Sequence, residues 1–219
     1  MSAFTIPSDC REVSIGELGL GAYLGVPEGA NGIVIFAHGS GSGRRSPRNN
    51  YVAQRLRQAG LATLLLDLLT PAEEGDRRNV FDIALLASRL QLAVDWASQE
   101  PETDDLPVGY FGASTGGGAA IRAAVGDPRI KAIVSRGGRP DLAGLQALAR
   151  VAAPTLLIVG SLDGIVIDLN RAAAEAMRCE RKLAIVPGAG HLFEEPGTLD
   201  EVVGLATAWF LSHLGGEAR

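Results

Sequence analysis

The chain has 219 residues, 47% of them hydrophobic, which is enough for one well-buried core and short for two, so we expect one domain over residues 1–219. Its net charge of −5 opposes binding to phosphate backbones and to anionic lipid, so neither nucleic acid nor membrane is an expected partner. Two cysteines exclude a disulfide framework, and without a recognisable signal peptide or a long apolar run the expected location is the cytoplasm.

The first half of the chain predicts a β-hairpin followed by alternating strands and helices. Continuous apolar runs are typical of strands buried on both faces, whereas the polar stretch Leu68–Val80, with Pro71 and Gly75, predicts a loop or a small excursion. In order, we expect strands at Val13–Glu17 and Leu20–Val26 joined at Gly19, a strand at Gly32–Ala37, a helix at Arg48–Ala59, a strand at Leu61–Leu66 and a helix at Phe81–Ser98.

The second half continues this alternation. Repeated strand–helix units predict an α/β fold with a mostly parallel sheet of about eight strands, flanked by helices on both sides, in which ligands bind beyond the carboxyl ends of the strands. In order, we expect a strand at Val108–Phe111, a helix at Thr115–Val125, a strand at Ile130–Ser135, a helix at Leu142–Val151, a strand at Thr155–Val159, a helix at Leu169–Cys179, a strand at Leu183–Val186 and a helix at Thr198–Leu214.

Residues 112–116 read Gly-Ala-Ser-Thr-Gly and match the pattern G-x-S-x-G. This segment lies between a predicted strand and a predicted helix, so a sharp turn would lift Ser114 above the sheet while the glycines let neighbouring backbone pass closely. The amino end of the helix would favour the negative charge that develops in acyl transfer. The alternative is a tight turn with an incidental serine, but the flanking strand and helix favour a nucleophile.

A serine hydroxyl needs a base to attack at neutral pH, and the base needs an orienting acid. Of the three histidines, His213 is expected on the surface near the end of the last helix, and His38 precedes a glycine-rich loop. His191 follows the last strand in a Pro-Gly-Ala-Gly-His segment that can bring an imidazole back across the edge of the sheet. We therefore expect His191 to be the base, with a structural histidine as the alternative.

Asp163 is the expected orienting acid. It follows a predicted strand and gives the chain order Ser, Asp, His that accompanies a strand–serine–helix turn. Asp168 is the nearest rival, and Asp141 is a weaker one. Both are more easily explained as caps of the helices predicted to follow them.

The loop His-Gly-Ser-Gly-Ser-Gly at 38–43 follows a predicted strand and supplies the expected oxyanion hole. We assign its donors to the backbone N–H groups of Ser40 and Thr115, with Gly39 as the alternative to Ser40. The same loop, with Asp67 at the next strand end, resembles a dinucleotide-binding fingerprint. Because Arg44 stands where that pattern needs its third glycine, nucleotide binding is the weaker interpretation.

From the GIVIFAHGSGSG segment to the GAGHLFEEPG segment, the chain resembles the α/β-hydrolase superfamily and, within it, the dienelactone hydrolase-like branch. The resemblance implies a compact core with minimal or no lid, Ser114 as nucleophile, Asp163 as acid, His191 as base and an oxyanion hole near Ser40. Dienelactone hydrolases carry a cysteine nucleophile, whereas this chain has a serine, so a general carboxylesterase is the expected activity.

The expected reaction is two-step hydrolysis of a small carboxylic ester through an acyl-enzyme on Ser114, with no metal or organic cofactor. A lactone, dienelactone or thioester could react at the same residues, and a non-catalytic small-molecule receptor is the alternative from another class. A homodimer is compatible with the sequence. Arg136 and Arg139, expected at the rim with Gly39, could hold a substrate carboxylate or could instead pair with local acids.

Overall fold

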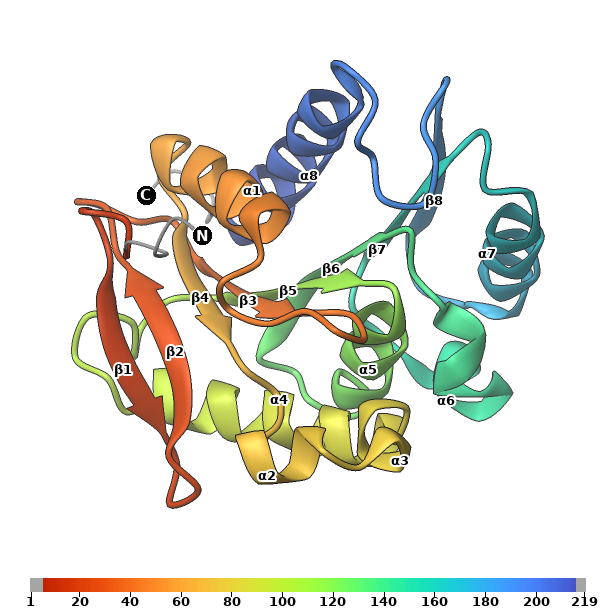
Figure 1. Cartoon of the computed structure of the whole chain (residues 1–219). Helices are drawn as coiled ribbons and strands as arrows, with labels where there is room; N and C mark the ends of the chain where they lie inside the picture. Colours follow the sequence, from red (N-terminus) through yellow and green to blue (C-terminus); the bar gives the residue numbers. More distant parts are fainter. Residues whose placement is uncertain (1–5, 216–219) are drawn as a thin grey trace.

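The computed structural model describes residues 6–215 and contains an eight-stranded sheet in the order β1-β2-β4-β3-β5-β6-β7-β8 (Figure 1). The first two strands form an antiparallel hairpin, β2 pairs antiparallel with β4, and every later pairing is parallel. The strands are β1 (Arg11–Ile15), β2 (Leu20–Gly25), β3 (Ile33–Ala37), β4 (Ala62–Leu66), β5 (Val108–Ala113), β6 (Ile130–Arg136), β7 (Thr155–Gly160) and β8 (Arg181–Val186). The predicted sheet is therefore confirmed.

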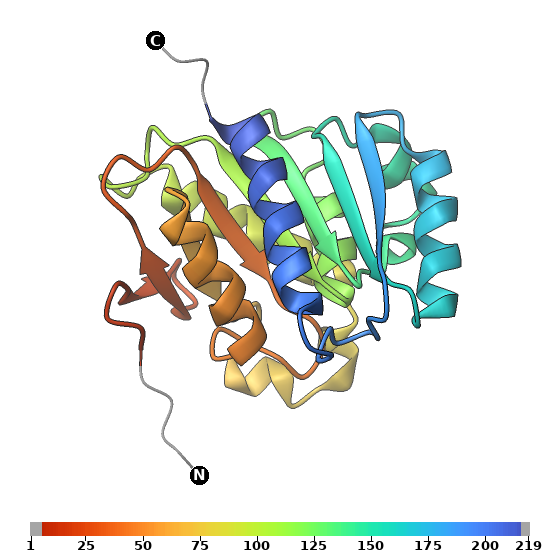
Figure 2. The ribbon, with the colours of Figure 1, turned by 90° about the horizontal axis from the view of Figure 1, so that it is seen from above.

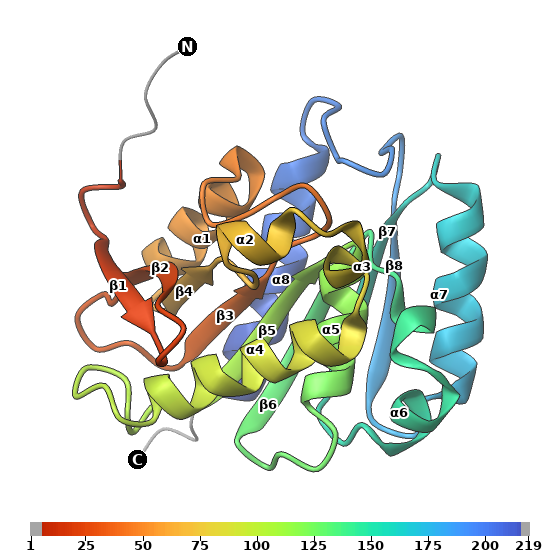
Figure 3. The ribbon, with the colours of Figure 1, turned by 60° about the horizontal axis from the view of Figure 1, so that its bottom comes forward.

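Helices cover both faces of this sheet. Helices α1 and α8 pack together on one face (Figure 2), and α4 and α5 pack on the other, with α6 and α7 beside them (Figure 3). The helical segments are α1 (Pro47–Gln58), α2 (Pro71–Glu74), α3 (Arg77–Val80), α4 (Ile83–Ala97), α5 (Thr115–Ala123), the 3₁₀ turn η1 (Pro140–Ala143), α6 (Leu145–Arg150), α7 (Gly164–Ala176) and α8 (Thr198–Leu214). Among residues 6–215, none of these helices is long and apolar enough to cross a bilayer.

The central strands are buried along their whole length because each of their faces meets a helical layer. In β3, Ile33 and Ile35 belong to the core beneath α4 and α5, while Val34 and Phe36 belong to the core beneath α1 and α8. This alternation follows from the two-residue period of a strand. It explains why β3 reads as one continuous apolar run, as the sequence predicts.

Two predicted segments fold differently from expectation. The stretch Leu68–Val80 contains the short helices α2 and α3, because Thr70 and Asp76 accept hydrogen bonds from the backbone at their amino ends. The helix predicted over Leu142–Val151 is divided at Gly144, whose φ of 85° separates η1 from α6.

Helix α7 begins at Gly164, five residues before the predicted Leu169. Asp168 therefore lies inside the helix, where it pairs with Arg171, and the prediction that it caps a helix is wrong. Asp141 likewise lies within η1 and pairs with Arg139 rather than capping a helix. In the hairpin, β1 ends two residues earlier than predicted because the turn begins at Gly16, which has a φ of 63°.

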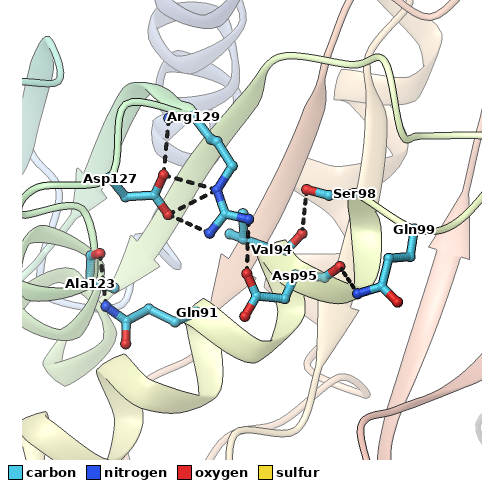
Figure 4. A network of polar contacts seen from close by, with 8 residues as sticks. All are labelled: Gln91, Val94, Asp95, Ser98, Gln99, Ala123, Asp127 and Arg129. Carbon is cyan, nitrogen blue, oxygen red and sulfur yellow. Dashed lines mark hydrogen bonds and ion pairs between the residues drawn. The ribbon is translucent and has the colours of Figure 1, made fainter.

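A polar network lies at the end of the sheet where the parallel strand β6 begins (Figure 4). Just before β6, the guanidinium of Arg129 donates to Asp127 through Nε and Nη2, and its Nη1 lies 2.8 Å from Asp95 on α4. The same guanidinium lowers the pKa of Asp127 below its ordinary value. These contacts join α4 to the α5–β6 connection, at the edge opposite the loops described next.

Candidate active site

Ser114 occupies a strained turn between β5 and α5. Its φ of 51° and ψ of −122° make it one of two non-glycine residues with positive φ among residues 6–215, the other being Phe193. Such backbone strain persists where the surrounding structure enforces it, and it concentrates at functional sites. A Cβ on Gly116 would lie 2.6 Å from the carbonyl carbon of Ala37, so a larger residue cannot form this turn as it stands.

Asp163 and His191 meet across the carboxyl ends of β7 and β8. The Nδ1 atom of His191 lies 2.6 Å from Oδ2 of Asp163, so the imidazole donates a hydrogen bond to the carboxylate. Asp163 precedes α7, yet its side chain forms no capping bond, which leaves the carboxylate free for His191. With Nδ1 committed, the Nε2 atom is the one that can accept a proton.

The segment Arg136–Arg139 connects the serine turn to this pair. The N–H of Ser114 donates to the carbonyl of Arg136 at 3.3 Å, and the N–H of Arg139 donates to the carbonyl of Ser114 at 2.9 Å. A Cβ on Gly137 would lie 3.6 Å from Nδ1 of His191. Within residues 6–215 the Ser114 hydroxyl forms no hydrogen bond, either to His191 or to any other group. Hydrogen bonds between a serine and its base are often long or poorly aligned before substrate binds.

The glycine loop and the start of α5 both adjoin Ser114. A Cβ on Gly39 would be 3.0 Å from the Cβ of Ser114, so the glycine loop passes close to the serine. Thr115 is the first residue of α5, where a backbone N–H has no acceptor one turn earlier. The N–H of Ser40 donates to no other backbone group in the described part of the chain. Both N–H groups are thus available to a bound oxyanion.

His38 holds the glycine loop in place, a role that the sequence did not reveal. Its Nε2 accepts a hydrogen bond from the N–H of Leu68 at 3.0 Å, and its Nδ1 lies 3.0 Å from the carbonyl of Gly39. Both ring nitrogens are engaged, and the side chain is buried. Asp67 anchors the same loop by accepting hydrogen bonds from the backbone and guanidinium of Arg44, so it is not free to bind a ribose.

A cleft of about 820 Å³ opens in front of the glycine loop. Its walls are the loop itself, the start of α1 and the α2–α3 segment, and it reaches Ser40 and Thr115. Leu69, Val80 and Leu86 are apolar residues that line the cleft. The cleft therefore places space for a small organic molecule next to the proposed donors.

The two arginines expected at the rim differ in their surroundings. Arg139 donates through Nε and Nη2 to Asp141, at 2.8 and 2.7 Å, which is the local pairing that the sequence left open. Arg136, the last residue of β6, is buried, and whether it contacts a substrate stays a prediction. Among residues 6–215, no three histidine, cysteine, aspartate or glutamate side chains gather as metal ligands would.

Known proteins resemble this chain over most of its length. The family model described as an alpha/beta hydrolase domain matches residues 30–202. A Mycobacterium tuberculosis (strain H37Rv) protein named "Putative phosphoribosyl transferase" is 58% identical over 94% of this chain but only 46% of its own length. The chain thus spans about half the length of that curated relative.

Two solved structures show the same architecture. Dienelactone hydrolase from Anabaena variabilis is 56% identical, with a TM-score of 0.89 over 94% of this chain and 99% of that one. Est1E from Butyrivibrio proteoclasticus is 17% identical, with a TM-score of 0.78 over 94% of this chain and 98% of that one, and so supports the fold alone. The chain belongs to the α/β-hydrolase family and to its dienelactone hydrolase-like branch.

Proposed function

We propose that this hydrolase cleaves small carboxylic esters through an acyl-enzyme on Ser114. The observation that carries the proposal is the hydrogen bond between Asp163 and His191, at the sheet edge where Ser114 occupies a strained strand-to-helix turn. Structural residues have little reason to combine a partly buried carboxylate, a half-buried imidazole and a strained serine at the carboxyl ends of β7, β8 and β5. A catalytic triad needs all three.

In the proposed first step, Nε2 of His191 takes the hydroxyl proton of Ser114 as its oxygen attacks the ester carbonyl. The N–H groups of Ser40 and Thr115 stabilise the resulting oxyanion, and His191 then donates the proton to the departing alcohol. In the second step, a water molecule gives its proton to His191 and attacks the acyl-enzyme, which releases the acid and restores Ser114. Asp163 orients the imidazole and stabilises its protonated form throughout.

Lactones, including dienelactones, and thioesters could enter the same reaction, because the acyl carbonyl is common to all of them. The 56% identity to a structure named as a dienelactone hydrolase supports this alternative. A serine at position 114, where a true dienelactone hydrolase is expected from the sequence to carry a cysteine, favours ordinary esters. The transferase name of the longer relative need not describe the half that this chain matches. We assign hydrolysis to that half. For this chain we propose a single catalytic domain that acts in the cytoplasm, as a monomer or a homodimer.

Ser114→Ala tests the proposal. We expect the wild-type protein to hydrolyse 4-nitrophenyl butyrate and the variant to lose at least about 10³-fold in kcat, because no other hydroxyl takes the place of the nucleophile. Release of 4-nitrophenolate measures the rate, and circular dichroism verifies the fold of the variant. Full activity in Ser114→Ala would contradict the proposal, and a folded wild-type protein that turns over no acyl substrate would favour the receptor alternative.

A further inference from the structure

His191 lies in a loop that has few bonds of its own. The connection between β8 and α8, residues 187–197, contains no helix or strand (Figure 1). Among residues 6–215, the N–H of His191 donates to no acceptor, and its imidazole is held by the one hydrogen bond to Asp163. The side chain of His191 is 39% exposed, so packing restrains it only in part. The position of the base therefore depends on what holds the backbone beside it.

The carboxylate of Glu195 holds that backbone. Its Oε2 accepts a hydrogen bond from the N–H of Gly190, the residue directly before His191, at 3.1 Å. In the part of the chain that the structure describes, Glu195 is the only side chain that bonds the backbone of residues 190–193. Backbone N–H groups, that of Gly190 first among them, hold the pKa of Glu195 below its ordinary value, so the carboxylate is ionised at neutral pH. Hydrogen bonds to an ionised acceptor are stronger than neutral ones.

The loop that Glu195 closes is tight and strained. A Cβ on Gly190 would lie 3.0 Å from Oε1 of Glu195, so the carboxylate lies directly against the backbone. Phe193, inside the loop, has a φ of 54°, and its N–H donates to the carbonyl of Gly190 at 3.3 Å. A residue other than glycine keeps such a backbone only where its surroundings enforce it. The buried ring of Phe193 and the carboxylate of Glu195 thus both restrain the path of the chain at His191.

Helix α8 does not need the side chain of Glu195. The main-chain carbonyl of Glu195 accepts from the N–H and Oγ1 of Thr198, at 3.1 and 2.8 Å, and these bonds would survive a change of side chain. The preceding glutamate, Glu194, has a different partner, because its carboxylate is 63% exposed and lies 2.6 Å from Nη1 of Arg48. Of the two consecutive glutamates, Glu195 is therefore the one whose carboxylate bonds the residue beside the base.

We propose that Glu195 is a positioning residue, whose carboxylate, bonded to Gly190, holds His191 where Nε2 can reach Ser114 while Nδ1 stays bonded to Asp163. This inference rests on the proposed function. Glu195 takes no part in proton transfer and acts only through the backbone of Gly190. Because a displacement of about 1 Å in a catalytic group can slow a reaction by about 10²-fold, loss of this bond should lower kcat rather than weaken ester binding.

Glu195→Met tests this role, because methionine has a similar length but no carboxylate. We expect kcat for 4-nitrophenyl butyrate to fall by about 10- to 100-fold while KM changes by less than about threefold. Glu195→Gln, whose side-chain oxygen can still accept from Gly190, should stay within about fivefold of the wild-type kcat. Glu194→Met is the matched control, because it removes the neighbouring carboxylate from the same loop, and its kcat should stay within about twofold of the wild type. Circular dichroism and thermal unfolding verify the fold of each variant.

Proton NMR of the resting protein adds a readout that does not depend on turnover. The imidazole proton that His191 donates to Asp163 should give a signal far downfield of the backbone amides, and His191→Gln assigns this signal by removing it. In Glu195→Met the signal should broaden or move upfield, because the imidazole is held less firmly against the carboxylate of Asp163. In Glu194→Met it should stay unchanged.

A folded Glu195→Met variant with the wild-type kcat, or with an unchanged downfield signal, would overturn the positioning role while leaving the esterase assignment intact. Equal losses of kcat in Glu195→Met and Glu195→Gln, or in Glu195→Met and Glu194→Met, would likewise contradict a role through the bond to Gly190. A wild-type protein that turns over no acyl substrate would contradict the proposed function instead. The NMR comparison would then still decide whether Glu195 holds the loop of His191.

Discussion

Replacing His191 with glutamine is expected to lower kcat for 4-nitrophenyl butyrate by about 10⁴- to 10⁶-fold, the range seen when the base of a serine triad is removed. Glutamine can still donate to Asp163, whose Oδ2 lies 2.6 Å from the imidazole, but it cannot take the proton of Ser114. Asp163→Asn should cost about 10⁴-fold, because an amide does not stabilise the tautomer that leaves Nε2 free. Steady-state kinetics at saturating ester measure both losses.

Asp168→Asn is the matched control for the acid. Asp168 lies within α7 only five residues from Asp163, but its side chain is exposed and pairs with Arg171. We expect its kcat to equal that of the wild type. A large loss in Asp168→Asn together with a mild effect in Asp163→Asn would show that the acid has been assigned to the wrong residue.

Gly116→Ala is expected to destabilise the protein by about 3 kcal/mol or more and to abolish activity. The new methyl group would overlap the carbonyl of Ala37 and would lie 2.7 Å from the carbonyl oxygen of His38. Strand β3 cannot yield, because it is paired on both sides, to β4 and β5. Urea unfolding followed by circular dichroism measures the loss of stability.

Gly204→Ala separates this steric effect from the general effect of replacing a helical glycine. Gly204 lies inside α8, and a Cβ there would meet no atom within 4 Å. Alanine should therefore raise the free energy of unfolding by about 0.5–1 kcal/mol and leave kcat unchanged. Similar stabilities for the two variants would mean that the close approach of α5 to β3 does not constrain the serine turn.

The sheet could be predicted because its signals are local. Buried strands such as β3 and β7 read as unbroken apolar runs, and the strand–serine–helix order around Ser114 is visible in one short stretch. The start of α7 could not be predicted in this way. Residues 164–167 read Gly-Ile-Val-Ile, which has poor helix propensity, and their helical state depends on tertiary packing through buried residues such as Val166.

The polar contacts show the same division between local and distant partners. Arg139 and Asp141 are only two residues apart, so their pairing could be considered from the sequence. The surroundings of Arg136 could not, because they include Phe193 and Arg48, which are far along the chain. The structural role of His38 could not be predicted for a similar reason, since its partner Leu68 lies thirty residues away.

Labelling with a serine-reactive fluorophosphonate tests the central claim most directly. The proposed mechanism predicts one covalent adduct on the wild-type protein, located by tandem mass spectrometry at Ser114 in the tryptic peptide Leu90–Arg122, which also carries Ser98. Labelling should become much slower in His191→Gln, because the base is lost. An unlabelled wild-type protein, or an adduct on Ser40 or Ser42 in the peptide Glu12–Arg44 instead, would contradict the assignment of Ser114 as the nucleophile.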